Sequence, residues 1–125
     1  MAGRWILVVE DEPAIAELLV EVLMGSGYLV QHAANGLQAW NLLRVSCPPD
    51  LVLTDVMMPE LDGTALMGRM RATRELEPIP VLVLSALDKE EVRSRLPLLK
   101  AFLPKPFQIG QLVANVDSLL RQRDA

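Results

Sequence analysis

The chain has 125 residues and a mass of 13.8 kDa, which suits one domain with its own hydrophobic core. Its hydrophobic content of 51% excludes a largely disordered chain, and no apolar run approaches the ~20 residues that a membrane-spanning helix needs. The net charge is −4 and the Lys and Arg residues form no basic run, which disfavours direct contact with nucleic acid. We therefore expect a single cytoplasmic domain over residues 1–125 that binds neither membrane nor nucleic acid.

Two rare residue types limit the chemistry further. The only cysteine, Cys47, cannot form an internal disulfide. The only histidine, His32, excludes a metal site with two histidines and argues against a Ser-His-Asp triad. Ordinary hydrolase chemistry is therefore disfavoured.

Short apolar runs alternate along the chain with segments of helical periodicity. The predicted strands are Trp5 to Val9, Tyr28 to Ala33, Leu51 to Thr54, Val81 to Leu84 and Ala101 to Leu103. The predicted helices are one that starts near Pro13 and stops at Gly25 and Gly27, then Leu37 to Arg44, Thr64 to Arg74, Asp88 to Leu96, and a last helix from Ile109 to Leu120. Strand and helix alternate five times, which predicts an α/β fold.

The first, third and fourth predicted strands are apolar at nearly every position. A strand needs this pattern when helices cover both faces of its sheet. We therefore predict a flavodoxin-like, doubly wound, five-stranded parallel sheet of order 2-1-3-4-5 with helices on both faces. In that order the first and third strands are neighbours, and ligand chemistry is expected beyond their carboxyl ends.

Polar residues directly follow the predicted strands. Glu10 and Asp11 follow the first strand and Asp55 the third, while Ser85 follows the fourth and Lys105 the fifth. Taken singly, each is more simply explained as a helix cap or an exposed loop residue. Taken together, the three carboxylates would repel one another in a shared pocket, and a hard divalent cation such as Mg²⁺ would relieve that repulsion.

The same residue set suits phosphoryl chemistry. One aspartate would act as the nucleophile, while the metal and Lys105 would neutralise a phosphoryl group and the Ser85 hydroxyl would donate a hydrogen bond to it. Lys105 could instead pair with Asp55 as a structural partner. We expect both roles, with the lysine bound to carboxylate or to phosphate according to the state of the protein.

Four motifs in this order resemble the receiver domain of two-component response regulators. They are Glu10-Asp11-Glu12-Pro13, Leu53-Thr54-Asp55-Val56-Met57-Met58-Pro59 with Asp62-Gly63, Ser85-Ala86, and Phe102-Leu103-Pro104-Lys105-Pro106-Phe107. The similarity runs nearly from end to end. By this resemblance Asp55 accepts a phosphoryl group, and Glu10 and Asp11 bind Mg²⁺ together with Asp55 and the backbone carbonyl of Met57.

The resemblance also implies roles for the later motifs. Ser85 and Phe102 correspond to the hydroxyl and aromatic pair that relays the signal, and Lys105 to the lysine that contacts the phosphoryl group. The bond from Lys105 to Pro106 is expected to be cis, as in many such domains. The implied donor is a sensor histidine kinase or a phosphotransfer protein. The output partner stays unidentified, and a homodimer stays open.

One segment departs from the family. Receivers usually carry a Gly-Ala pair shortly before the aromatic residue, where this chain has Pro97-Leu98-Leu99-Lys100-Ala101. A proline without a glycine stop predicts an early or kinked end of the fourth helix. The change falls on the surface of the fourth helix, fifth strand and last helix, which receivers often use for output or dimerisation.

Three other functions share parts of this pattern. A flavodoxin-like electron carrier needs a phosphate-cradling loop after the first strand, where Glu10-Asp11-Glu12 would repel the FMN phosphate. A Mg²⁺-dependent phosphatase with an aspartyl nucleophile, as in the haloacid dehalogenase family, needs an Asp-x-Asp motif there and usually a cap domain. A protein-interaction module that works without phosphorylation would not need the full acidic set, Ser85 and Lys105. We therefore predict a signalling switch that catalyses only its own phosphorylation and dephosphorylation, without an output domain in these residues.

Overall fold

The strands and helices alternate along the chain in a computed structural model, which describes residues 4–45, 47–56, 62–96, 99 and 101–124. The strands are β1 (Trp5–Val9), β2 (Leu29–Ala33), β3 (Leu51–Asp55), β4 (Val81–Ser85) and β5 (Phe102–Pro104), and the helices are α1 (Pro13–Gly25), α2 (Gly36–Val45), α3 (Gly63–Arg71), α4 (Lys89–Arg95) and α5 (Ile109–Asp124). All neighbouring strands are parallel, in the order β2-β1-β3-β4-β5. The predicted sheet is confirmed.

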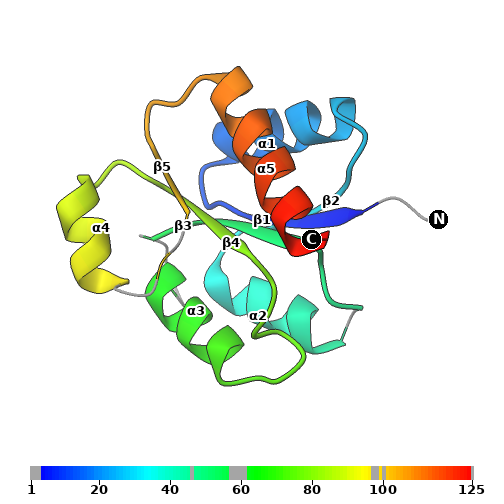
Figure 1. Cartoon of the computed structure of the whole chain (residues 1–125), viewed down its shortest axis with the longest axis vertical. Helices are drawn as coiled ribbons and strands as arrows, with labels where there is room; N and C mark the ends of the chain where they lie inside the picture. Colours follow the sequence, from blue (N-terminus) through cyan, green and yellow to red (C-terminus); the bar gives the residue numbers. More distant parts are fainter. Residues whose placement is uncertain (1–3, 46, 57–61, 97–98, 100, 125) are drawn as a thin grey trace.

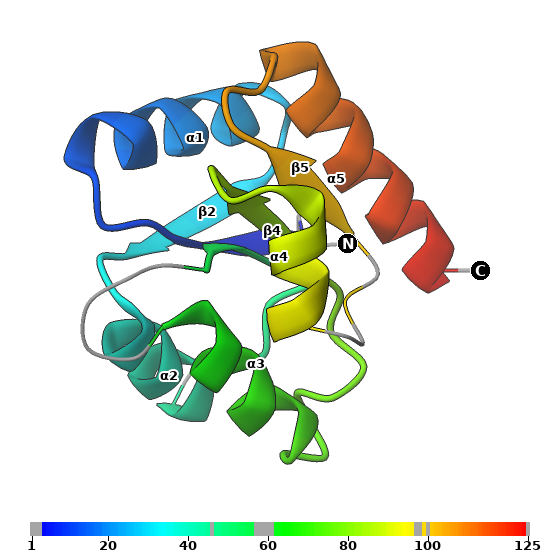
Figure 2. The ribbon, with the colours of Figure 1, turned by 90° about the vertical axis from the view of Figure 1, so that its left-hand side faces the viewer.

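Helices cover both faces of the sheet, as predicted. Figures 1 and 2 show α1 and α5 on one face and α2, α3 and α4 on the other. Successive side chains of β1 point to opposite faces, so Ile6 and Val8 join the apolar cluster under α1 and α5, while Leu7 and Val9 join the cluster under the other helices. This double coverage explains why the central strands are apolar throughout.

The ends of α1 and α4 follow the predicted stop signals. Helix α1 ends at Gly25, and Gly27 adopts a φ of 98°, a conformation that glycine tolerates best. Helix α4 ends at Arg95, and Leu96 leaves the helical region with φ −132° and ψ 70°. A following proline disfavours helical backbone at the residue before it, which explains this early end. Pro97 itself lies outside the described residues.

Helix α3 and strand β5 differ from the prediction. Helix α3 ends at Arg71, short of Arg74, and the Thr73 hydroxyl donates a hydrogen bond to the Arg69 carbonyl at 2.8 Å. Such a side-chain bond competes with continued helix, which periodicity does not reveal. Strand β5 is displaced by one residue and spans Phe102–Pro104. The observed strand begins at the aromatic residue that the resemblance links to signal relay.

Candidate functional site

The candidate site lies at the carboxyl edge of the sheet. Asp55 and Ser85 are the last residues of β3 and β4, and Glu10 directly follows β1. The turn after β5 carries Lys105, whose backbone N–H donates to the Ser85 carbonyl at 2.8 Å. Because all strands are parallel, their carboxyl ends meet at one edge, and β1 and β3 are neighbours there.

Lys105 joins the two carboxylates of this edge. Its Nζ donates to Glu10 Oε1 at 3.0 Å and to Asp55 Oδ2 at 2.8 Å. The side chains of Lys105, Glu10 and Asp55 are only 15%, 2% and 14% exposed. Lys105 thus pairs with Asp55, as predicted for the unphosphorylated state, and with Glu10 as well. We call these three side chains the lysine cluster.

Burial and pairing shift two pKa values in the lysine cluster. Burial raises the pKa of Glu10, and this effect exceeds the lowering by the Glu12 N–H and by Lys105. Burial alone would lower the pKa of Lys105, but its hydrogen bonds and charge interactions with Asp55 and Glu10 outweigh burial and raise it. When ionised, the cluster has two negative charges and one positive charge. An additional cation would therefore be favoured here.

The donor set fits Mg²⁺ by its chemistry. Glu10 and Asp55 supply hard carboxylate oxygens, and the adjacent Asp11 is exposed beside them. Among the described residues, no three His, Cys, Asp or Glu side chains gather into a ready-made metal site. Mg²⁺ does not need one, because it is usually held by one or two carboxylates and completes its shell with water and phosphate oxygens. Met57, the fourth expected ligand, lies outside the described residues.

Backbone contacts fix the position of Asp55. Its Oδ1 accepts a hydrogen bond from the Val56 N–H at 2.6 Å, and its backbone carbonyl accepts one from the Thr54 hydroxyl at 2.9 Å. A Cβ atom on Gly63 would lie 2.4 Å from that carbonyl oxygen. Gly63 therefore allows the start of α3 to approach Asp55, a role that sequence reasoning missed although the glycine belongs to a quoted motif.

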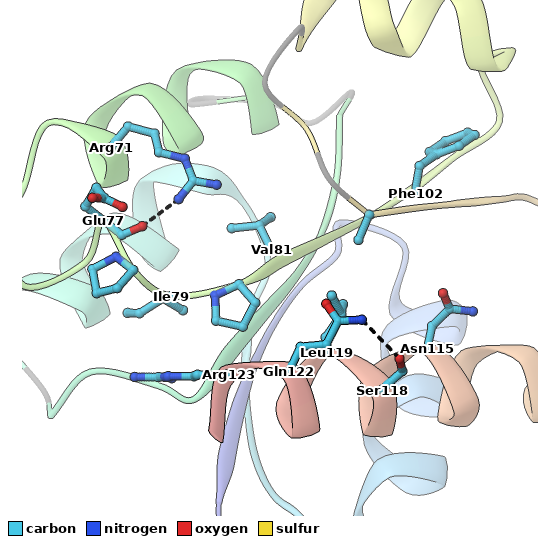
Figure 3. Close-up of a pocket in the computed structure, with 13 residues that line it drawn as sticks. Arg71, Glu77, Ile79, Val81, Phe102, Asn115, Ser118, Leu119, Gln122 and Arg123 are labelled. Carbon is cyan, nitrogen blue, oxygen red and sulfur yellow. Dashed lines mark hydrogen bonds between the residues drawn. The ribbon is translucent and has the colours of Figure 1, made fainter. Parts of the chain in front are cut away.

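Ser85 and Phe102 lie on neighbouring strands. Ser85 is 1% exposed, and its Oγ accepts a hydrogen bond from the Leu87 N–H at 3.0 Å. Phe102 pairs with Val83, two residues before Ser85 on β4, and is half-buried. Figure 3 shows its ring pointing away from α5, and it lines a groove with Val92 of α4. The bond from Lys105 to Pro106 is cis, which confirms that expectation.

His32 contributes a contact that the sequence does not reveal. Its Nε2 lies 2.8 Å from the Glu10 backbone oxygen. From the sequence alone, His32 is notable only as the single histidine of the chain. Its nearness to Glu10 becomes visible once the register of β1 and β2 is known, because Val8 pairs with His32.

A cavity of about 920 Å³ lies away from this chemistry. Figure 3 shows its lining by Arg71 of α3, Ile79 and Val81 near the start of β4, and Gln122 of α5. Those elements meet at the amino edge of the sheet, and no member of the lysine cluster lines the cavity. The converging polar side chains of the lysine cluster, and not this cavity, therefore mark the candidate site.

Fold and site together define a flavodoxin-like α/β domain with an acidic turn after β1 in place of a phosphate-cradling loop. The model of the response regulator receiver domain family matches residues 6–117, and the chain belongs to this family. Such domains are signalling modules of two-component systems, and they generally bind Mg²⁺ for phosphorylation.

Individual proteins support the same assignment. The DNA-binding dual master transcriptional regulator RpaA of Synechocystis is 36% identical over 121 residues, which cover 95% of this chain and 50% of RpaA. The receiver domain of a signal transduction histidine kinase from Syntrophus aciditrophicus is 38% identical, with a TM-score of 0.87 and coverage of 97% and 92%. The response regulator TrrA of Thermotoga maritima, solved with Mg²⁺ and BeF, is 30% identical, with a TM-score of 0.82 and coverage of 93% and 98%. The chain thus spans about half the length of the curated relatives it matches.

Proposed function

We propose that residues 1–125 form one receiver domain that works as a phosphorylation-dependent signalling switch, with Asp55 as the phosphoacceptor. The observation that carries this proposal is the Asp55 carboxylate at the carboxyl end of β3, bonded to Lys105 Nζ at 2.8 Å. Response regulators receive their signals from histidine kinases. The donor for this chain is accordingly a sensor histidine kinase or a phosphotransfer protein.

The transfer is a nucleophilic displacement at phosphorus. A carboxylate oxygen of Asp55 forms a new O–P bond while the N–P bond to the donor histidine breaks, and the histidine nitrogen keeps the electron pair. Lys105 then exchanges its bond to the Asp55 carboxylate for one to a phosphoryl oxygen. The Ser85 hydroxyl, which now accepts from the Leu87 N–H, has a proton that it donates to another phosphoryl oxygen.

Glu10, Asp11 and Asp55, together with the backbone carbonyl of Met57, would hold Mg²⁺. The ion would neutralise charge on the phosphoryl oxygens during transfer. The unbalanced charge of the lysine cluster supports a cation here, as does the Mg²⁺ in the related TrrA structure. The chain would catalyse only its own phosphorylation and dephosphorylation and would not turn over other substrates.

The new charge on Asp55 would be relayed through Ser85 and Phe102. Movement of the Ser85 hydroxyl toward the phosphoryl group would leave room for the Phe102 ring, which is half-buried and has no hydroxyl group to desolvate.

The output partner of this chain stays unidentified, and the formation of a homodimer stays a prediction. So does the absence of direct nucleic-acid contact by these residues, although the longer relative RpaA is named as DNA-binding. Within the described part of the chain, no helix combines the length and apolarity needed to cross a membrane.

Incubation with acetyl phosphate and Mg²⁺, followed by intact-mass and peptide analysis, tests the proposal. We expect one phosphoryl group on Asp55 of the wild type, none without Mg²⁺, and none in Asp55→Asn. Asp62→Asn is the matched control, since it removes a nearby carboxylate while asparagine still caps α3 in place of Asp62. Modification of a residue other than Asp55, or none at all, would refute the assignment.

A further inference from the structure

His32 lies on the edge strand β2, beside the acidic turn. It is exposed, and its register partner on β1 is Val8, two residues before Glu10. Its imidazole Nε2 lies 2.8 Å from the Glu10 backbone oxygen. A carbonyl oxygen only accepts hydrogen bonds, so Nε2 is the protonated nitrogen of this contact.

The His32 imidazole forms its hydrogen bond at the point where the backbone pairing of β1 and β2 ends. The Glu10 N–H still donates to the Ala33 carbonyl at 3.1 Å, and β2 ends at that residue. The next N–H of the chain, that of Ala34, donates instead to Gln38 Oε1 at 2.9 Å. On the other side of Glu10, the His32 side chain supplies the bond to its carbonyl. Both peptide groups that flank Glu10 are therefore held from β2.

Holding the Glu10 carbonyl also orients Asp11. The carbonyl of Glu10 and the N–H of Asp11 belong to the same planar peptide group. Fixing one end of that plane fixes the direction in which Asp11 leaves the strand. The turn is held a second time by the Glu12 N–H, which donates to Glu10 Oε2 at 3.2 Å. His32 thus contacts the backbone of Glu10, one expected metal ligand. It also orients the peptide group that leads into Asp11, the next expected ligand.

We propose that His32 is a positioning residue for Mg²⁺ binding, which it supports by holding the Glu10–Asp11 peptide from the edge strand. This inference rests on the proposed function. In this role the Nε2–H of His32 bonds to the Glu10 carbonyl, and a protonated nitrogen cannot at the same time ligate the metal. Groups that orient metal ligands from outside typically change metal affinity by about 10- to 100-fold when removed. Since His32 acts through a backbone carbonyl, we expect the lower end, about tenfold.

Four versions of the full chain test this role: wild type, His32→Ala, His32→Gln and Gln31→Ala. The glutamine amide offers a donor in place of Nε2–H, so His32→Gln should recover most of the affinity. Gln31 is the matched control, because it is exposed on the same strand and points to the opposite face of the sheet. Titration with Mg²⁺ alone, followed by amide NMR shifts, gives the dissociation constants. Acetyl phosphate kinetics at varied Mg²⁺ give the half-saturating concentration and the maximal rate.

We expect His32→Ala to bind Mg²⁺ about tenfold more weakly. Its phosphorylation rate at saturating Mg²⁺ should change much less, and the Asp11 amide signal should already shift without metal. Wild-type affinity in His32→Ala would overturn the inference, as would an equal loss in Gln31→Ala, which would mean that the edge strand as a whole is weakened. Failure of the proposed function appears separately, as a wild type that neither binds Mg²⁺ nor becomes phosphorylated.

Discussion

At the carboxyl edge of the sheet two carboxylates share one ammonium group, whereas at the amino edge Arg123 forms an ion pair with a single carboxylate, that of Asp50. In the lysine cluster, Glu10 and Asp55 both bond to Lys105, and all three side chains are largely buried. At the amino edge Arg123 pairs with Asp50 at 3.8 Å, and both side chains are about one-third exposed.

The amino edge ties α5 to the starts of the strands. Asp50 Oδ2 also accepts the backbone N–H of Trp5 at 2.9 Å, and the Tyr28 hydroxyl donates to Asp117 of α5. Arg4 Nη1 donates to the carbonyl of Leu120 at 3.2 Å. These contacts join residues far apart in the chain. They stabilise the packing of α5 against the amino ends of the strands.

The difference separates side chains that hold the fold together from side chains to which we assign the proposed phosphoryl chemistry. A partly exposed ion pair such as Arg123–Asp50 contributes little to the free energy of unfolding. A buried cluster with one carboxylate too many is unfavourable for the metal-free fold, and it gains when a cation arrives. Substitutions at the two edges should therefore respond differently to Mg²⁺ and to salt.

Lys105→Met should have the largest effect on stability. It leaves two buried carboxylates without their cation, a change that typically costs about 3 kcal/mol. If Mg²⁺ binds the folded chain at the proposed site, it should stabilise this variant more than the wild type. Urea unfolding with and without Mg²⁺ measures both effects. Equal stabilisation of the two proteins by Mg²⁺ would contradict the unbalanced charge that we assign to the carboxyl edge.

Gly63→Ala should have the next largest effect, because its Cβ would lie 2.4 Å from the Asp55 carbonyl oxygen. Such overpacking against backbone costs about 2 kcal/mol. Gly68 is the matched control on α3, since its Cβ would meet nothing within 4 Å. Gly68→Ala should stabilise the chain by up to about 1 kcal/mol through helix propensity. Thermal unfolding gives both values, and equal shifts in the two variants would contradict the close approach to Asp55.

The sequence was sufficient for the sheet order and for the residues at the carboxyl edge. Both depend on local signals, namely apolar runs and the polar residue that ends each run. The contacts that position Asp55 and Glu10 were not predictable in this way. Gly63 and His32 act through distances between backbone segments, and such distances follow from register and packing.

The contacts at the amino edge were equally unpredictable from the sequence. Tyr28 and Asp117 are 89 positions apart, and no periodicity links them. The end of α3 was missed for a different reason, because one hydroxyl of Thr73 competes with the helix locally. Patterns of hydrophobicity thus predict the layers of the fold and the residues at the carboxyl edge of the sheet. Individual polar contacts can be identified only in the folded structure.

Asp117→Asn should have a moderate effect, visible in the titration of Tyr28, the only tyrosine. Burial and Asp117 raise the pKa of Tyr28 from 10 to about 12. The folded chain therefore keeps this proton between pH 10 and 12 while the unfolded chain loses it, so stability falls as pH rises through that range. Asp117→Asn should lower the pKa and cost about 1 kcal/mol at neutral pH.

Tyrosinate absorbance measures that pKa directly, with circular dichroism as the control for folding at each pH. An unchanged tyrosine titration in Asp117→Asn would show that Asp117 does not act on Tyr28. A change in Mg²⁺ affinity would be equally informative, since it would mean that the two edges of the sheet are coupled.

Arg123→Ala should have the smallest effect. Its pair with Asp50 is one-third exposed, and exposed ion pairs contribute about 0.5 kcal/mol. Added salt screens exposed charges far more than buried ones, so the difference between Arg123→Ala and wild type should shrink in high salt. The loss caused by Lys105→Met should persist there. Urea unfolding of both variants at low and high sodium chloride, without Mg²⁺, makes the comparison. If Arg123→Ala retained its full effect in high salt, the amino edge would be held by the Arg123 hydrogen bonds to the carbonyls of Pro49 and Asp50 rather than by charge.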